Sequence, residues 1–209
     1  MLTRLLAFFF HHLYHGLANF YDWVSWTVSF GQWNAWIKLT LTEISGTRIL
    51  ELGFGPGHLQ RAIADLGLDS VAIDESPQMA RLARRRLIQR GQYRGQLARA
   101  VAQAMPFRGE SFDSIVATFP TRYILDARTL SEAHRVLRGT GRLIVLPAAW
   151  PRSRLLNWLY RVTGESPLEA QSQFLKEWTG PFEQAGFDTT QKIIELRSGR
   201  LLLILATKR

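Results

Sequence analysis

Glu51-Leu-Gly-Phe-Gly-Pro-Gly57 is the stretch of this sequence that decides the fold. Its first residues belong to the stretch 48–53, in which Ile49, Leu50 and Leu52 predict a buried β-strand. Leu59, Ile63 and Leu66 follow it at helical spacing. Glycines at this place permit a tight turn and let a ligand come close to the backbone. Because open α/β sheets bind ligands at the carboxyl ends of their strands, the loop predicts a ligand site.

Two other kinds of glycine loop do not fit this stretch. A phosphate-binding P-loop ends in Gly-Lys-Ser/Thr, whereas His58 and Leu59 follow Gly57 here. A dinucleotide-binding fingerprint needs its third glycine at position 58, which is a histidine. That fingerprint also has no use for an acid two residues before its first glycine. Glu51 therefore indicates a third kind of glycine loop.

The rest of the chain alternates short apolar runs with helical stretches. The patterns predict strands over 48–53, 71–74, 112–119, 141–147, 187–197 and 200–207, and helices over 58–66, from Ser76-Pro77 onward and around 130–137. Helical spacing over 173–185 is interrupted at Gly180-Pro181, and Ser198-Gly199 fits a two-residue hairpin turn. Strands that alternate with helices predict an α/β fold with a doubly wound, mostly parallel sheet that ends in an antiparallel hairpin.

The order acid-x-Gly-x-Gly-x-Gly resembles that of the class I, Rossmann-like S-adenosylmethionine-dependent methyltransferases. The resemblance covers about residues 48–207 and includes three further motifs in the family's order. These are Val71-Ala-Ile-Asp-Glu-Ser-Pro-Gln-Met79, Met105-Pro-Phe-Arg-Gly-Glu-Ser-Phe-Asp113, and Glu132-Ala-His-Arg-Val-Leu137 leading into Gly141-Arg-Leu-Ile-Val145. The resemblance implies a seven-stranded sheet and S-adenosylmethionine as the cofactor, with S-adenosylhomocysteine as the product and no metal.

Carried over residue by residue, the resemblance assigns cofactor binding to ten positions. Glu51 would reach the ammonium group of the methionine moiety, directly or through water. Asp74 would accept hydrogen bonds from the ribose hydroxyls, and Met79 or its neighbours would pack against adenine. The full set is Glu51, Gly53, Gly55, Gly57, Asp74, Glu75, Met79, Ala102, Gln103 and Thr118.

The sequence departs from the family where adenine would be recognised. The family often has an Asp-Ala pair there, whose acid binds the adenine amino group, but Val101-Ala102 stands in its place. Without that acid, adenine recognition would fall to the Ala102 amide or to Gln103.

The first 37 residues are aromatic and almost uncharged: they hold 11 of the chain's 24 aromatic side chains and two charges, Arg4 and Asp22. The uncharged run over 5–21 carries three histidines and an asparagine, which argues against a membrane-spanning helix, and it lacks a signal-peptide pattern. We expect residues 1–46 to form an aromatic helical extension, and 47–209 to form the cofactor-binding domain. The extension would lie on that domain as a lid or in a membrane interface.

Two tyrosines are the candidate catalytic residues. Tyr123 follows the strand over 112–119, where the family's fold places residues beside the reactive methyl group. Tyr21-Asp22 resembles a Tyr-Asp pair that precedes the domain in quinone and lipid methyltransferases. The Asn/Asp-Pro-Pro-aromatic motif of amino-methylating nucleic-acid enzymes is absent, and so is any cysteine.

Seven arginines and no acid lie between Arg81 and Arg99, so this segment carries most of the net charge of +9. Such a segment fits an anionic membrane surface better than nucleic acid, because only Tyr93 is available there for base stacking. The leading function is methyl transfer to a small or lipid-like apolar acceptor, in the cytoplasm or at the periphery of a membrane. The alternatives are an RNA or protein methyltransferase that docks through the basic segment, and a non-catalytic cofactor- or lipid-binding module.

Overall fold

The computed structural model describes residues 32–88, 95–151, 178–197 and 199–209. Its centre is a seven-stranded sheet in the order β3-β2-β1-β4-β5-β7-β6. The strands are β1 (Ile49–Leu52), β2 (Ser70–Asp74), β3 (Gln96–Arg99), β4 (Phe112–Thr118), β5 (Leu137–Pro151), β6 (Phe187–Leu196) and β7 (Gly199–Lys208). The first five run parallel, and β7 pairs antiparallel with both β5 and β6. The predicted fold class is therefore confirmed.

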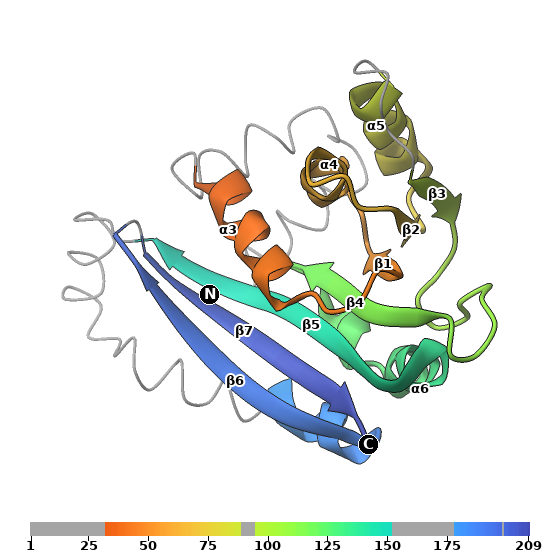
Figure 1. Ribbon diagram of the computed structural model, residues 1–209, viewed down its shortest axis with the longest axis vertical. Coiled ribbons are helices and arrows are strands. Elements are labelled where there is room, and N and C mark those ends of the chain that lie inside the picture. Colours follow the sequence, from red (N-terminus) through yellow and green to blue (C-terminus); the bar gives the residue numbers. More distant parts are fainter. Residues whose placement is uncertain (1–31, 89–94, 152–177, 198) are drawn as a thin grey trace, which may run out of the picture.

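Helices cover both faces of the sheet (Figure 1). They are α3 (Trp33–Thr40), α4 (His58–Asp65), α5 (Pro77–Ile88) and α6 (Ala127–Val136), with 3-10 turns η2 (Leu41–Glu43) and η3 (Arg122–Leu125). In Figure 1, α3, α4 and α5 lie on one face, and α6 lies on the other with a helical stretch over 178–184.

The alternation of side chains along β1 builds a core on each face. Leu50 and Leu52 belong to the cluster that faces α6, whereas Ile49 packs with Ile37 of α3 and Ile63 of α4. All four residues of β1 are buried, which is expected of a central parallel strand covered on both faces. This strand carries the glycine loop at its carboxyl end.

The start of α5 follows the predicted capping pattern. The helix begins at Pro77, and the Met79 N–H donates to the Ser76 Oγ at 3.3 Å. A serine before the first turn and a proline at its first position both favour a helix start here. Because α5 begins directly after β2, its first turn lies at the edge of the sheet where the glycine loop also lies.

Two details differ from the sequence patterns. β3 was not predicted as a strand from its own residues, because Gln96–Arg99 is a half-exposed edge strand without an apolar run. The predicted break at Gly180-Pro181 is wrong, since the chain is helical over 178–184. Proline lacks only its own N–H there, and its carbonyl oxygen still accepts the Ala185 N–H at 3.1 Å.

The described part of the N-terminal extension packs on the sheet. Trp36 and Ile37 of α3 are buried against side chains of β4, β5 and β7. The boundary at 46/47 stays a prediction, and residues 1–31, with Tyr21, lie outside the described residues. No helix within the described ranges is long and apolar enough to cross a membrane.

Candidate cofactor site

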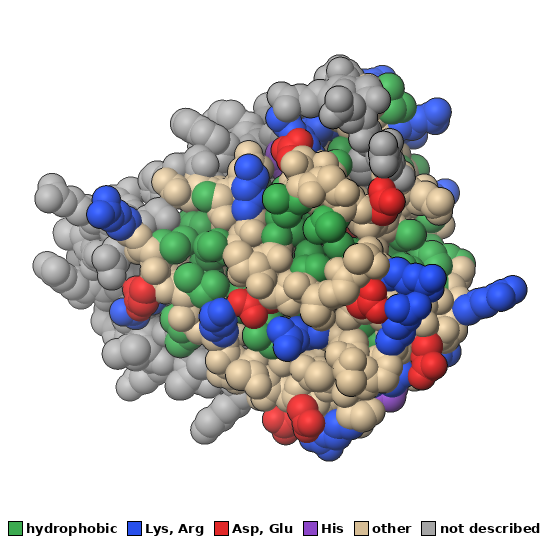
Figure 2. Space-filling model, viewed as in Figure 1, with side chains coloured by type: hydrophobic (Ala, Val, Ile, Leu, Met, Phe, Trp, Pro, Cys, Tyr) green, Lys and Arg blue, Asp and Glu red, His purple; other side chains and the backbone are tan. Residues whose placement is uncertain are grey.

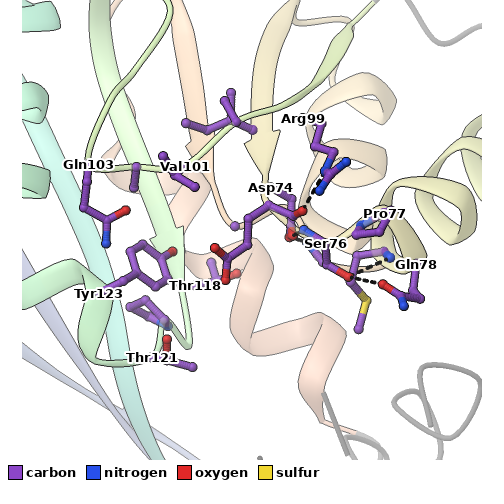
Figure 3. A pocket seen from close by; sticks show the side chains of 18 of the residues that line it. Asp74, Ser76, Pro77, Gln78, Arg99, Val101, Gln103, Thr118, Thr121 and Tyr123 are labelled. Carbon is purple, nitrogen blue, oxygen red and sulfur yellow. Dashed lines mark hydrogen bonds between the residues drawn. The ribbon is translucent and has the colours of Figure 1, made fainter. Parts of the chain in front are cut away.

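A cavity of about 1000 Å³ opens at the carboxyl ends of β1, β2 and β4. Four segments line it: the glycine loop, the end of β2 with the start of α5, the residues after β3, and the turn after β4 (Figure 3). The cavity walls include eight of the ten predicted cofactor residues, namely Gly53, Gly55, Asp74, Glu75, Met79, Ala102, Gln103 and Thr118. Glu51 and Gly57 are buried and do not line the cavity.

The glycine loop needs its glycines for two different reasons. Gly53 and Gly57 have φ of +71° and +85°, a region that side chains with a Cβ disfavour. At Gly53 a Cβ would also lie 2.7 Å from the Tyr123 hydroxyl, and at Gly57 it would lie 3.1 Å from the Cβ of Ala83 on α5. The loop is therefore both left-handed and closely packed.

Asp74 joins the glycine loop to the end of β2. Its Oδ2 accepts the Gly55 N–H at 2.8 Å, and its Oδ1 accepts the Ser76 N–H at 2.8 Å. Burial raises the pKa of the Asp74 carboxyl, while the two backbone N–H groups oppose that rise by stabilising its charge. Since Asp74 also lines the cavity, the remaining lone pairs of its oxygens are available to hydroxyl donors of a ligand.

Glu51 is only 1% exposed and does not line the cavity. Its Oε2 accepts a hydrogen bond from the Gln60 Nε2 at 2.7 Å, and the Gln60 Oε1 accepts one from the Ser70 Oγ at 2.8 Å. Burial raises the pKa of Glu51 to about 8; Gln60 lowers it, and the nearby Asp74 charge adds to the rise. This buried Ser70–Gln60–Glu51 chain was not predicted from the sequence.

A pair of residues on α6 holds the segment between β3 and β4. The Met105 N–H donates to the Glu132 Oε2 at 2.7 Å, and the Arg135 guanidinium donates to the carbonyl oxygens of Phe107 and Met105 at 2.8 and 3.1 Å. Arg135 also binds both oxygens of Glu132, at 2.6 and 2.8 Å. Glu132 and Arg135 thus fix the chain just after Ala102 and Gln103, in the place where the family resemblance locates adenine.

Tyr123 lies at the opposite end of the cavity from Pro77 and Gln78 (Figure 3). Its hydroxyl donates to the carbonyl oxygen of Leu52 at 3.1 Å, so it braces the start of the glycine loop. Tyr123, which was predicted to be catalytic, therefore has a structural role through this contact.

These residues fit S-adenosylmethionine on the chain's own features. Nothing lies within 4 Å of a Cβ position at Gly55, so a ligand has room against this part of the loop. The Asp74 carboxylate lines the cavity, and so does Val101, which is apolar and 43% exposed. Such a surface offers polar groups for a ribose and an apolar patch for a purine. In the described ranges there is no group of three or more His, Asp or Glu side chains that could hold a metal ion.

Comparisons with known proteins find methyltransferases. A family model described as a methyltransferase domain matches residues 50–145. The chain is 30% identical to the demethylmenaquinone methyltransferase of Thermotoga maritima, over 81% of this chain and 70% of that protein. It is also 30% identical to the ubiquinone/menaquinone biosynthesis C-methyltransferase UbiE of Geotalea uraniireducens, over 71% of this chain but only 66% of that protein.

A solved structure shares the fold. The S-adenosylmethionine-dependent methyltransferase of Thermotoga maritima described as a possible histamine N-methyltransferase superposes with a TM-score of 0.63 and 20% identity, covering 95% of this chain and 100% of that one. A glycine loop after β1, an acid ending β2 and a terminal antiparallel hairpin are together the features of a class I S-adenosylmethionine-dependent methyltransferase. Within that class, the chain belongs to the quinone methyltransferase family.

Proposed function

We propose that the protein transfers a methyl group from S-adenosylmethionine to a ring carbon of a quinone-like, apolar acceptor. The observation that carries the proposal is one cavity with two different ends. Asp74, at the end of β2, forms a polar end, and Phe119, Pro120 and Tyr123 form an apolar end at the tip of β4. The glycine loop joins the two ends, because the Gly55 N–H donates to Asp74 and the Leu52 carbonyl oxygen accepts from the Tyr123 hydroxyl. The names of the relatives, a demethylmenaquinone methyltransferase and a quinone C-methyltransferase, support this acceptor class.

When bound, S-adenosylmethionine supplies an electrophilic methyl group, whose bond to sulfur breaks as a bond to the ring carbon forms and the ring loses a proton. The chain's own residues bind and align. Asp74 holds ribose hydroxyls, the backbone at Gly53 and Gly55 approaches the methionine moiety, and Ala102 or Gln103 recognises adenine. Tyr123 positions the glycine loop through its hydrogen bond to Leu52. The apolar end of the cavity excludes water, and methyl transfer depends mainly on the alignment of the two reactants in such a site.

Replacing Asp74 with alanine tests the cofactor part of this proposal. We expect the Kd of S-adenosylhomocysteine, measured by titration calorimetry, to rise at least about tenfold, because a hydrogen bond to a charged group is worth about 1.5–3 kcal/mol. Asp113→Ala is the matched control: its Oδ2 accepts the Thr47 and Arg48 N–H groups at 3.0 Å, at the other end of β1. A folded Asp74→Ala variant that binds as tightly as the wild type would remove Asp74 from the site.

We further propose that the enzyme meets its acceptor at an anionic membrane surface, through one face of α5. Arg81, Arg84, Arg85 and Ile88 recur at helical spacing, all four are exposed, and Ile88 is 61% exposed. None of the three arginines pairs with an acid among the described residues, whereas Arg86 donates to the Pro56 carbonyl oxygen at 2.6 Å. Figure 2 shows basic and apolar side chains side by side at the upper right, where α5 lies.

Exchanging Arg81, Arg84 and Arg85 together for glutamine tests this membrane contact. Each arginine near an anionic surface contributes about 1 kcal/mol, so we expect the affinity for phosphatidylglycerol-containing vesicles to fall about a hundredfold in a flotation assay. The control exchanges three exposed arginines away from α5 (Arg108, Arg128 and Arg197), with the same change in net charge. Equal loss in both variants would contradict a docking face on α5, and binding to RNA but not to vesicles would favour the nucleic-acid alternative.

A further inference from the structure

Phe119, directly after β4, has a backbone conformation that a bulky residue rarely adopts. Its φ is +49°, and among the described residues only Glu110 is another non-glycine with positive φ. This region is unfavourable for a residue with a Cβ, so surrounding contacts must hold the residue there. One of them is the Phe119 N–H, which donates to the Leu146 carbonyl oxygen of β5 at 2.7 Å.

Helix α3 holds the Phe119 side chain. The Trp33 ring stacks on the Phe119 ring, with centroids 4.1 Å apart and an interplanar angle of 26°. Phe119 also packs against the two apolar clusters under α3, which contain Ile37 and Trp36. Helix α3 therefore fixes the position of a ring that directly follows the central strand β4 in sequence.

Phe119 is at the same time part of the cavity wall. It lines the cavity with Pro120, Thr121 and Tyr123, which follow it in the turn. In Figure 3, Thr118, Thr121 and Tyr123 lie on one side of the cavity, across from Ser76, Pro77 and Gln78 at the start of α5. Phe119 therefore lies at the end of the cavity away from α5. This is the apolar end, where the proposed function places the acceptor.

Resting on that proposed function, we propose that Phe119 determines acceptor specificity: its ring, held by Trp33, is the wall on which a planar aromatic acceptor stacks. Stacked aromatic rings gain energy beyond the area that they bury, which an aliphatic chain does not. A ring fixed by strained backbone and by a helix loses little freedom when a ligand arrives, so it binds a flat ligand as a preorganised surface. The inference also gives α3 a function, because α3 completes the acceptor site through Trp33.

Four variants and one control test the inference. The probes are a short-chain 2-prenyl-1,4-naphthoquinone, for binding in the presence of S-adenosylhomocysteine, and its hydroquinone, for methylation. We expect Phe119→Leu to raise the Kd of the quinone and the KM of the hydroquinone about tenfold, and Phe119→Tyr to change them less than about twofold. Trp33→Leu should raise both about threefold, and add nothing in the Trp33→Leu/Phe119→Leu double variant, because Trp33 acts through Phe119.

The control is Phe107→Leu, which removes a partly buried ring that packs edge-on against Phe112, outside the cavity wall. It should leave the quinone Kd unchanged, and no variant should change the Kd of S-adenosylhomocysteine by more than about twofold. A Phe119→Leu variant with the wild-type quinone Kd, or fully additive effects at positions 33 and 119, would overturn the inference. A wild-type protein that binds the quinone without methylating the hydroquinone would overturn the proposed function alone. A wild-type protein that neither binds the quinone nor methylates the hydroquinone would overturn both the proposed function and the inference.

Discussion

The Gly53→Ala variant is expected to lose about a hundredfold in affinity for S-adenosylhomocysteine, because a displaced loop gives up hydrogen bonds to the ligand that are worth about 0.5–1.5 kcal/mol each, and two to three of them amount to a factor of this size. Two separate effects cause the loss. The φ of +71° at Gly53 is unfavourable for alanine, and its Cβ would lie 2.7 Å from the Tyr123 hydroxyl oxygen. Tyr123 must then give up its hydrogen bond to the Leu52 carbonyl oxygen, and the start of the loop loses its support.

Gly67→Ala separates these two effects. Gly67 has nearly the same φ, +72°, but a Cβ there would have nothing within 4 Å. Gly67→Ala should therefore show only the backbone strain, about 1–2 kcal/mol in the free energy of unfolding, with unchanged cofactor affinity. Calorimetric titration and chemical unfolding of both variants measure the two quantities.

The double variant Gly53→Ala/Tyr123→Phe tests the role of the hydroxyl. Without it, the nearest Tyr123 atom to the new Cβ is the ring carbon Cζ at 3.6 Å, an ordinary contact. We expect the double variant to bind the cofactor more tightly than Gly53→Ala alone and more weakly than the wild type. If Tyr123→Phe gives no recovery, the clash is not what displaces the loop.

The sequence predicted the parts of the fold that are periodic and buried. β1, β4 and β7 are mostly apolar strands inside the sheet, so their residue types alone predict that they are buried. β3 is different: it pairs only with β2, at the edge of the sheet, and its exposed Gln96 and Arg99 carry no strand pattern. An edge strand of this kind is fixed by its neighbour, which a local pattern does not contain.

The candidate site divides in the same way. Glycines and acids at the ends of predicted strands could be assigned, because strand order places them at one edge of the sheet. The contacts between distant residues could not: Asp74 binds the N–H of Gly55, and Tyr123 binds the carbonyl oxygen of Leu52. The left-handed conformation of Phe119 had no signal at all, since glycine or asparagine is the residue expected there.

Glu51 offers the second large effect, in the pH dependence of stability. Burial raises its pKa in the folded protein to about 8, from 4.5 for an ordinary glutamate. Between these two values the folded state holds a proton that the unfolded state has released, so the free energy of unfolding falls as pH rises. The stabilisation is complete below about pH 4.5 and is lost as pH rises to about 8, above which the loss levels off.

Glu51→Gln removes this titration with little change in shape. A glutamine carbonyl oxygen can still accept the hydrogen bond that the Gln60 Nε2 donates at 2.7 Å, and it stays neutral at every pH. We expect the variant to gain stability over the wild type with rising pH, by on the order of 3 kcal/mol between pH 5 and pH 9. Denaturant unfolding at several pH values measures the difference, and Glu183→Gln, which alters an exposed glutamate outside the cavity wall, should run parallel to the wild type.

The same variant separates stability from cofactor binding. If the ionised Glu51 reaches the ammonium group of the cofactor, wild-type affinity for S-adenosylhomocysteine rises as the pH approaches 8, because binding must first remove the Glu51 proton. Glu51→Gln should then bind at least about tenfold more weakly at pH 8, although it is the more stable protein. A variant that gains stability and keeps its affinity would leave Glu51 a support of the glycine loop, with the ammonium group held by the backbone around Gly53 and Gly55.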